Sequence, residues 1–214
     1  MRRTRIKICG VRDATSALVA AECGADAVGF VFVEHSPRFI TPEDAWPILE
    51  ALPPFVQTVG LFADADLEDL LIAKDACPFH LAQLHSVEAE PVVRRCGPDL
   101  IKAVRYEPDT IEHELRRWSA VGEIDALLID GGPGGTGERV DWEHLASVAS
   151  ASAHPLILAG GLTPENVAEA IATVRPFAVD VSSGVERERG VKDPALIRAF
   201  CEAVRDADHD SHSA

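Results

Sequence analysis

The chain has 214 residues, of which 47% are hydrophobic, and 20 Lys and Arg against 35 Asp and Glu give a formal net charge of −15. This length suits one domain with a sizeable core, and such a surface repels phosphodiester backbones, which argues against nucleic acid as the main partner. No apolar run reaches the roughly 18 residues of a membrane span, and the N-terminal residues lack the apolar stretch of a secretory signal. We therefore expect a cytoplasmic protein that makes no membrane contact.

The five cysteines are scattered along the chain, odd in number and without a CxxC pair. This usage predicts neither a disulfide framework nor a zinc site, and no metal site is expected. The cysteines are Cys9, Cys23, Cys77, Cys96 and Cys201.

Apolar runs of strand length alternate with amphipathic stretches of helix length along the whole chain. The predicted strands are residues 5–9, 27–32, 56–62, 80–85, 100–105, 125–130, 155–160 and 176–182. The predicted helices are residues 13–23, 42–51, 65–76, 88–96, 109–120, 141–151, 164–173 and 193–206.

These eight strand-then-helix units favour a single-domain (β/α)8 TIM barrel. The strands are rich in Val, Ile and Leu without clean alternation, which is typical of a parallel sheet covered by helices. A count of eight, in a chain slightly below the roughly 250 residues typical of this fold, favours a closed barrel over an open sheet. We assign residues 1–206 to the barrel and the polar residues 207–214 to a disordered tail.

Capping residues support several of these boundaries. Thr41, Thr163 and Asp193 each stand directly before a proline, which is the favoured way to begin a helix. Gly24 and Gly97 stand where preceding helices should end in a left-handed residue.

Unusual residues fall at the ends of the predicted strands, where barrel enzymes carry their active sites. Lys7 and Cys9 share one face of the first strand, and a neighbouring cation favours the thiolate. The alternative is that Cys9 is only a small buried hydrophobe. Asp130 ends the sixth strand, where burial favours the neutral carboxyl form that a general acid needs. The alternative interpretation is that Asp130 only caps the next element. Residues 131–137 then form a glycine-rich loop.

Three further ionisable residues have two interpretations each. Arg38, in the loop after the second strand, could clasp a carboxylate or lie solvated on the surface. His85, at the end of the fourth strand, could serve the site or bond only to backbone groups. Asp180, in the eighth strand, could be a second carboxylate in the pocket or an ion-pair partner of Lys7 or Lys102.

The loops after the seventh and eighth strands predict a phosphate site. Such loops offer exposed backbone N–H groups and helix N-termini, and barrels often bind phosphate there. The candidate residues are Gly160, Gly161, Ser182, Ser183 and Gly184.

Several motifs together resemble phosphoribosylanthranilate isomerase, an enzyme family of tryptophan biosynthesis. The resemblance runs from Lys7 to about residue 200, and its most specific motifs are "KICG" near the N-terminus and "VDVSSGVE" near the C-terminus. It is also carried by "SPRFI", "QLH", "LLID" and "LAGGLTPENV". It implies a (β/α)8 barrel without cofactor or metal.

The resemblance also implies a reaction and residue roles. The reaction is the Amadori rearrangement of N-(5-phosphoribosyl)anthranilate to 1-(2-carboxyphenylamino)-1-deoxyribulose 5-phosphate, a small phosphorylated aminosugar. The family's general base and acid correspond to Cys9 and Asp130, and Arg38 is expected to meet the anthranilate end of the substrate. The chain departs from the family where Ser86 replaces the usual glycine, and the loop after Asp130 looks short.

Two rival functions remain at this stage. A histidine-pathway isomerase of similar chemistry carries an aspartate at the end of the first strand, where this chain has Cys9. A non-catalytic, thiol-sensing phosphate barrel would leave Asp130 without a purpose. The motifs do not distinguish a monomer from a dimer.

Overall fold

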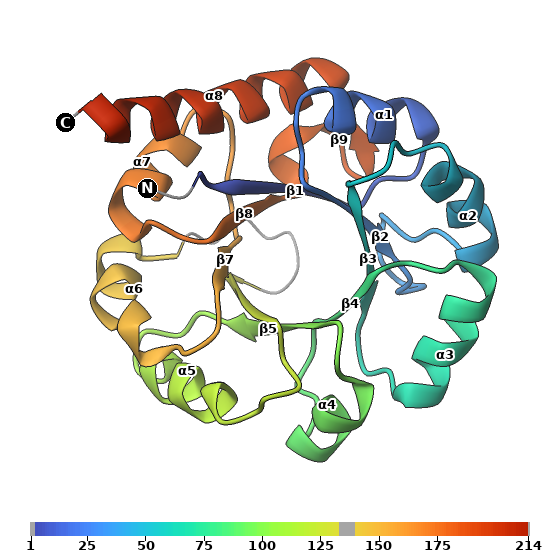
Figure 1. Cartoon of the computed structure of the whole chain (residues 1–214), viewed down its shortest axis with the longest axis horizontal. Coiled ribbons are helices and arrows are strands. Elements are labelled where there is room, and N and C mark those ends of the chain that lie inside the picture. Colours follow the sequence, from blue (N-terminus) through green and yellow to red (C-terminus); the bar gives the residue numbers. More distant parts are fainter. Residues whose placement is uncertain (1–2, 133–139, 214) are drawn as a thin grey trace.

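A computed structural model describes residues 3–132 and 140–213 of the chain. Eight parallel strands pair in sequence order and close into one barrel, as predicted (Figure 1). The strands are β1 Arg5–Cys9, β2 Ala27–Val31, β3 Gln57–Phe62, β4 Leu81–Leu84, β5 Leu100–Arg105, β6 Ala126–Asp130, β7 Leu156–Leu158 and β8 Ala178–Val181.

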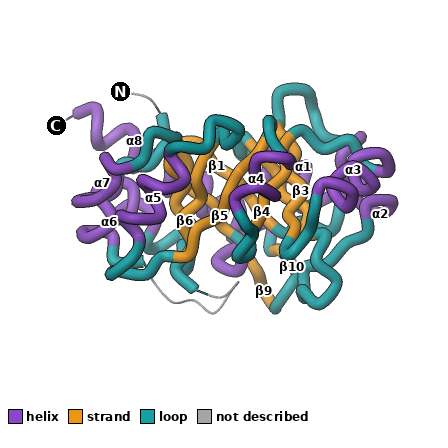
Figure 2. Tube along the Cα trace, turned by 90° about the horizontal axis from the view of Figure 1, so that it is seen from below, coloured by secondary structure: helices purple, strands orange, loops and turns teal. Residues whose placement is uncertain are grey.

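Helices surround this barrel on the outside (Figures 1 and 2). They are α1 Ala14–Glu22, α2 Pro42–Glu50, α3 Leu67–Ala76, α4 Glu90–Cys96, α5 Ile111–Ser119, α6 Trp142–Val148, α7 Val167–Val174 and α8 Pro194–Ser213. Within the described part of the chain, none of the helices has the length and apolarity needed to cross a bilayer.

The core has two layers because successive strand residues point to opposite faces. Ile6 and Ile8 belong to the larger cluster between strands and helices. The barrel interior holds a smaller apolar cluster of Val59, Ile101, Ala103, Ala126, Leu128, Ile157, Ala159 and Ala178. Lys7, Gln83 and Asp180 are buried polar residues at alternate positions of β1, β4 and β8, and they face the interior. The interior is therefore apolar apart from a few polar groups near the site.

Some predicted boundaries hold and others shift. Thr41 caps α2 by accepting a hydrogen bond from Asp44 N, and Gly24 has the expected left-handed φ of 84°. The helix predicted from residue 164 instead begins at Val167, because the Asn166 side chain accepts from Thr163 N and closes a turn before it.

The prediction of a left-handed cap at Gly97 is wrong. Its backbone is extended, with φ −81° and ψ 169°. A Cβ at this position would lie 2.5 Å from the backbone oxygen of Glu123. Glycine is required here by the close approach of another chain segment.

Two features at the C-terminal end were not predicted. A short hairpin, β9 Glu186–Glu188 and β10 Val191–Lys192, follows the 3-10 turn η2 Ser183–Val185. Helix α8 continues to Ser213, past the predicted start of a disordered tail at residue 207. Its Asp208 carboxylate accepts hydrogen bonds from the backbone N–H and hydroxyl of Thr4, which attaches the helix to the chain segment before β1.

Candidate active site

Cys9 ends β1 and its side chain is buried. It lies opposite Gly29 of β2, where a Cβ would stand 3.0 Å from the Cys9 sulfur. The thiol therefore occupies space that only a glycine on the neighbouring strand leaves open.

Lys7 and Asp180 form an ion pair inside the barrel. They are register partners on β1 and β8, and Nζ lies 2.7 Å from Oδ1. Burial alone would lower the pKa of Lys7, but the negative charges of Asp180 and Cys9 raise it to about 12. Of the two roles open for Asp180, the structure gives it that of Lys7's partner; Lys102 pairs with Glu88 instead, at 2.7 Å.

Lys7 acts on the Cys9 thiol in the expected direction, because its positive charge and its hydrogen bond lower the pKa of that thiol. Burial raises the pKa of the Cys9 thiol above 9.0, and the nearby lysine charges offset this only in part, while Asp180 adds to it. Asp180 lies 2.7 Å from Lys7 Nζ and balances part of the lysine charge, which limits the effect of Lys7 on the thiol.

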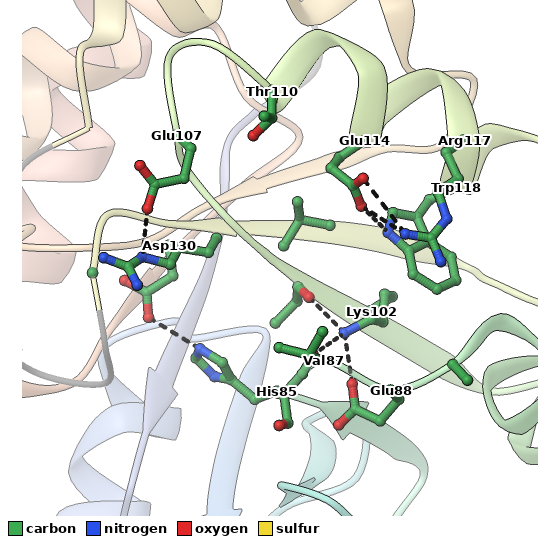
Figure 3. A pocket seen from close by; sticks show the side chains of 16 residues that line it. His85, Val87, Glu88, Lys102, Glu107, Thr110, Glu114, Arg117, Trp118 and Asp130 are labelled. Atoms are coloured by element: carbon green, nitrogen blue, oxygen red, sulfur yellow. Dashed lines mark hydrogen bonds and ion pairs between the residues drawn. The ribbon is translucent and has the colours of Figure 1, made fainter.

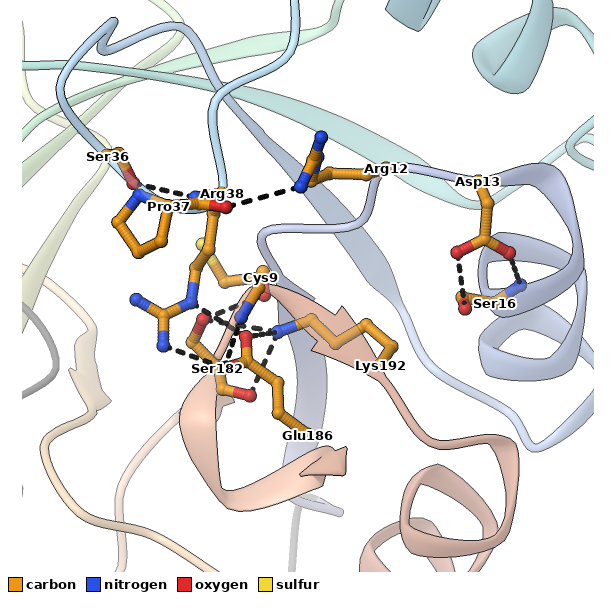
Figure 4. A network of polar contacts seen from close by, with 11 residues as sticks. Cys9, Arg12, Asp13, Ser16, Ser36, Pro37, Arg38, Ser182, Glu186 and Lys192 are labelled. Carbon is orange, nitrogen blue, oxygen red and sulfur yellow. Dashed lines mark hydrogen bonds and ion pairs between the residues drawn. The ribbon is translucent and has the colours of Figure 1, made fainter. Parts of the chain in front are cut away.

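Arg38 is buried and binds Glu186 with two hydrogen bonds (Figure 4). Its Nε lies 2.7 Å from Oε1 and its Nη2 3.0 Å from Oε2. Lys192 Nζ lies 2.8 Å from the same Oε1. Burial would raise the pKa of Glu186, but the two cations hold it below its usual value, and burial lowers the pKa of Lys192. Sequence reasoning gave Glu186 and Lys192 no role.

Ser182 joins the ends of β8 and β1. Its hydroxyl donates to the Cys9 carbonyl at 3.0 Å and accepts from Lys192 Nζ at 3.2 Å. Lys192 also donates to the Ser182 carbonyl at 2.9 Å. The predicted phosphate ligand Ser182 thus has its hydroxyl engaged with the strand that carries Cys9.

The loops after β7 and β8, which carry the predicted phosphate ligands, lie against each other. Gly160 and Gly161 have φ of 81° and 70°, which glycine tolerates. A Cβ on Gly184 would lie 1.9 Å from the Leu162 carbonyl oxygen, so these two loops touch at a glycine. The neighbouring Ser183 is exposed.

Asp130 and His85 face each other at the other side of the rim. His85 Nε2 lies 3.3 Å from Asp130 Oδ2, and both side chains line a cavity of about 520 Å³ (Figure 3). The cavity continues from Asp130 past β5 to the buried Lys102 and to Trp118 of α5. Of the glycine-rich loop 131–137, residues 133–137 lie outside the described residues, so the expectation of a short loop after Asp130 falls outside them too.

One further contact lies on this side of the rim. The hydroxyl of Ser86, the departure from the family pattern, donates to Asp64. No cluster of three or more His, Cys, Asp and Glu side chains suited to a metal occurs among the residues with described positions.

Comparison with known proteins identifies close relatives. The family model for N-(5'phosphoribosyl)anthranilate (PRA) isomerase matches residues 6–203. N-(5'-phosphoribosyl)anthranilate isomerase of Pseudomonas fluorescens (strain Pf0-1) is 49% identical over 207 residues, covering 96% of this chain and 100% of the relative. The enzyme of the same name from Geobacter sp. (strain M21) is 46% identical, covering 92% and 96%.

Solved structures agree with these sequences. Phosphoribosyl anthranilate isomerase from Thermus thermophilus superposes with a TM-score of 0.86 at 37% identity, covering 95% of this chain and 99% of the other. A second isomerase, also 37% identical with the same coverage and a TM-score of 0.85, was solved in complex with reduced 1-(o-carboxyphenylamino)-1-deoxyribulose 5-phosphate.

Proposed function

The chain belongs to the N-(5'-phosphoribosyl)anthranilate isomerase family, and we propose that Cys9 and Asp130 are the base and acid of its reaction. The reaction is the Amadori rearrangement of N-(5'-phosphoribosyl)anthranilate to 1-(2-carboxyphenylamino)-1-deoxyribulose 5-phosphate, in tryptophan biosynthesis. The observation that carries the proposal is the placement of both residues at strand ends in a chain that matches the family from residue 6 to 203.

The substrate phosphate is proposed to bind between the loops after β7 and β8. Gly160 and Gly161 have left-handed backbones without side chains, and Gly184 lets the second loop touch the first at Leu162. Backbone N–H groups without side chains nearby suit a dianion. Ser183 is exposed next to Gly184, whereas Ser182 contributes by holding β8 to β1.

Asp130 is proposed to open the sugar ring. It donates its proton to the ring oxygen as the C1–O bond breaks, and the nitrogen lone pair forms the C1=N bond of a Schiff base. His85 contacts the second oxygen of the same carboxyl group and keeps it oriented. A positioned acid typically contributes about 10²–10⁴-fold to the rate.

Cys9 is proposed to remove the proton from C2. The electron pair of the C2–H bond forms a C1=C2 double bond, and the iminium nitrogen becomes a neutral amine. The resulting enolamine gains a proton at C1 and loses the C2 hydroxyl proton, which gives the ketose. A thiolate with a raised pKa is a strong base once formed, and the lysines Lys7 and Lys192 stabilise its charge.

Arg38 is proposed to bind the anthranilate carboxylate. Its two bonds to Glu186 use Nε and Nη2, which fixes the guanidinium plane and leaves Nη1 on another edge. Lys7 and Asp180 are proposed to bind the sugar hydroxyls. As an ion pair, they are also proposed to balance the charge around Cys9. The five cysteines are free thiols, which supports a reducing, cytoplasmic location.

The test follows the loss of anthranilate-type fluorescence when purified protein meets freshly made N-(5'-phosphoribosyl)anthranilate. We expect the fluorescence to fall rapidly with the wild-type protein. The rate of this fall should be about 10²–10⁴-fold lower with Asp130→Asn. The exposed Asp75→Asn variant of α3 serves as a matched control and should react like wild type. An unchanged rate in Asp130→Asn would remove this residue from the mechanism.

A further inference from the structure

Gln83 is a buried polar residue that the proposed mechanism does not use. It is 1% exposed and faces the barrel interior from β4, two residues before His85. Its Nε2 lies 3.5 Å from His85 Nδ1, and its Oε1 has no hydrogen-bonding partner among the described residues. A fully buried amide beneath the rim is costly unless its hydrogen bonds serve a purpose.

The contacts form a chain of three side chains. Gln83 contacts one ring nitrogen of His85, and the other ring nitrogen lies 3.3 Å from Asp130 Oδ2. An amide N–H can only donate, so the Nδ1 atom that faces it must accept and carry no proton. The remaining ring proton then stands on Nε2 and points at Asp130.

We infer that Gln83 is a positioning residue that holds His85 as the neutral Nε2–H tautomer and thereby directs one hydrogen bond to Asp130 Oδ2. This inference rests on the proposed role of Asp130. A neutral ring leaves the carboxyl group able to keep its own proton, whereas a charged imidazolium would favour the carboxylate. With Oδ2 accepting from His85, the acidic proton belongs on Oδ1, the oxygen that faces Gly160.

The orientation of the Gln83 amide determines which ring nitrogen of His85 carries the proton. If the Gln83 oxygen faced the ring, Nδ1 would carry the proton, and His85 would be either an imidazolium or an acceptor of the Asp130 proton at Nε2. Either arrangement would weaken Asp130 as an acid toward the substrate. The orientation with nitrogen toward Nδ1 is the one that serves ring opening.

Three charged groups of the described residues near Gln83, His85 and Asp130 have partners of their own. Arg105 of β5 binds Glu107 at 2.9 Å, and Lys102 binds Glu88 at 2.7 Å in the adjoining cavity. On the side of β3, Asp64 accepts from Ser86. We attribute the position of the His85 ring proton to the Gln83 amide, whose Nε2 lies 3.5 Å from Nδ1.

The first experiment is nitrogen NMR of the wild-type protein with 15N-labelled histidine. The His85 signals are identified by their loss in His85→Gln. We expect an unprotonated Nδ1 and a protonated Nε2 at neutral pH. A protonated Nδ1, as the other tautomer or as an imidazolium, would overturn the inference without any variant of Gln83 having to fold.

The second experiment compares Gln83→Glu with Gln83→Met. A carboxylate can only accept, so Gln83→Glu should protonate Nδ1. The alkaline fall in kcat should then move to lower pH, and a displacement of one pH unit lowers kcat about tenfold at any pH above that fall. Gln83→Met keeps the buried volume without the charge, and its kcat should fall at unchanged KM with the pH profile in place.

Gln57→Glu is the matched control, because it makes the same change at an exposed position of β3 and should alter neither readout. A pH profile of Gln83→Glu equal to that of wild type would overturn the inference. If the wild-type protein has the expected His85 tautomer but no isomerase activity, the proposed function is contradicted. The hydrogen bonds from Gln83 through His85 to Asp130 are then still supported.

Discussion

Lys7 and Asp180 form a buried ion pair at 2.7 Å between two residues 173 positions apart in the chain. They close the barrel, since they join β1 to β8, and they stand directly below the end of the strand that carries Cys9.

This pair predicts a specific pattern of stability. Removing one partner leaves an uncompensated buried charge, so Lys7→Met or Asp180→Leu should each lower the free energy of unfolding by about 3–5 kcal/mol. The double variant Lys7→Met/Asp180→Leu should lose much less than the sum, because both charges are gone. Denaturant unfolding measures this cycle. Additive losses in the double variant would show that the two charges are not coupled.

The Cys9 thiol should titrate above pH 9.0 in the unliganded protein, because burial outweighs the lysine charges. The difference in ultraviolet thiolate absorbance between wild type and Cys9→Ser, measured against pH, reports this titration. The sign for stability follows: the unfolded thiol ionises first as pH rises, so Cys9 lowers stability increasingly above pH 9. A thiolate already formed at neutral pH would contradict this picture.

Gly184→Ala should weaken binding of the phosphorylated substrate. The added Cβ would meet the Leu162 carbonyl oxygen at 1.9 Å and must push apart the loops after β7 and β8. We expect KM to rise at least tenfold, which corresponds to about 1.4 kcal/mol of lost binding. Gly122→Ala is the matched control, since its Cβ would meet nothing within 4 Å. Equal KM values in the two variants would argue against a phosphate site between these loops.

Arg38→Lys should destabilise the protein and raise KM. A lysine cannot make the two parallel bonds that Arg38 makes to Glu186, so a loss of about 1.5–3 kcal/mol is expected for the charged hydrogen bond. Arg116→Lys changes the same pair type on the exposed face of α5, where about 0–1 kcal/mol is expected. Thermal unfolding of both variants checks the contrast, and equal losses would show that the Arg38 pair contributes no more than a surface pair.

The fold could be predicted because its signals are local. The apolar runs and the caps at Thr41 and Asp193 each depend on neighbouring residues only, and the eight-stranded barrel follows from their order. The prediction at Gly97 was wrong because glycine is needed there by the close approach of Glu123. Glu123 lies on a distant segment, so the residues next to Gly97 in the sequence do not indicate this contact.

The site was predicted less completely for the same reason. Cys9 and Asp130 stand out as unusual residues at strand ends, but the bond between Arg38 and Glu186 joins residues 148 positions apart. Gln83 looks like an ordinary strand residue until its contact with His85 is seen. Lys192 had a sequence signal, because it stands directly before the helix-capping Asp193 in "VKD". A lysine that is buried at such a position needs an anionic partner, and that partner is Glu186.

The most direct test of the account is the fluorescence assay on Cys9→Ser beside wild type, with N-(5'-phosphoribosyl)anthranilate as substrate. The serine variant keeps the shape that Gly29 accommodates and replaces the thiol by a hydroxyl that does not ionise in this range. The account predicts that kcat falls by about 10²–10⁴-fold while circular dichroism shows an intact fold. A Cys9→Ser enzyme that turns over substrate as fast as wild type would contradict it.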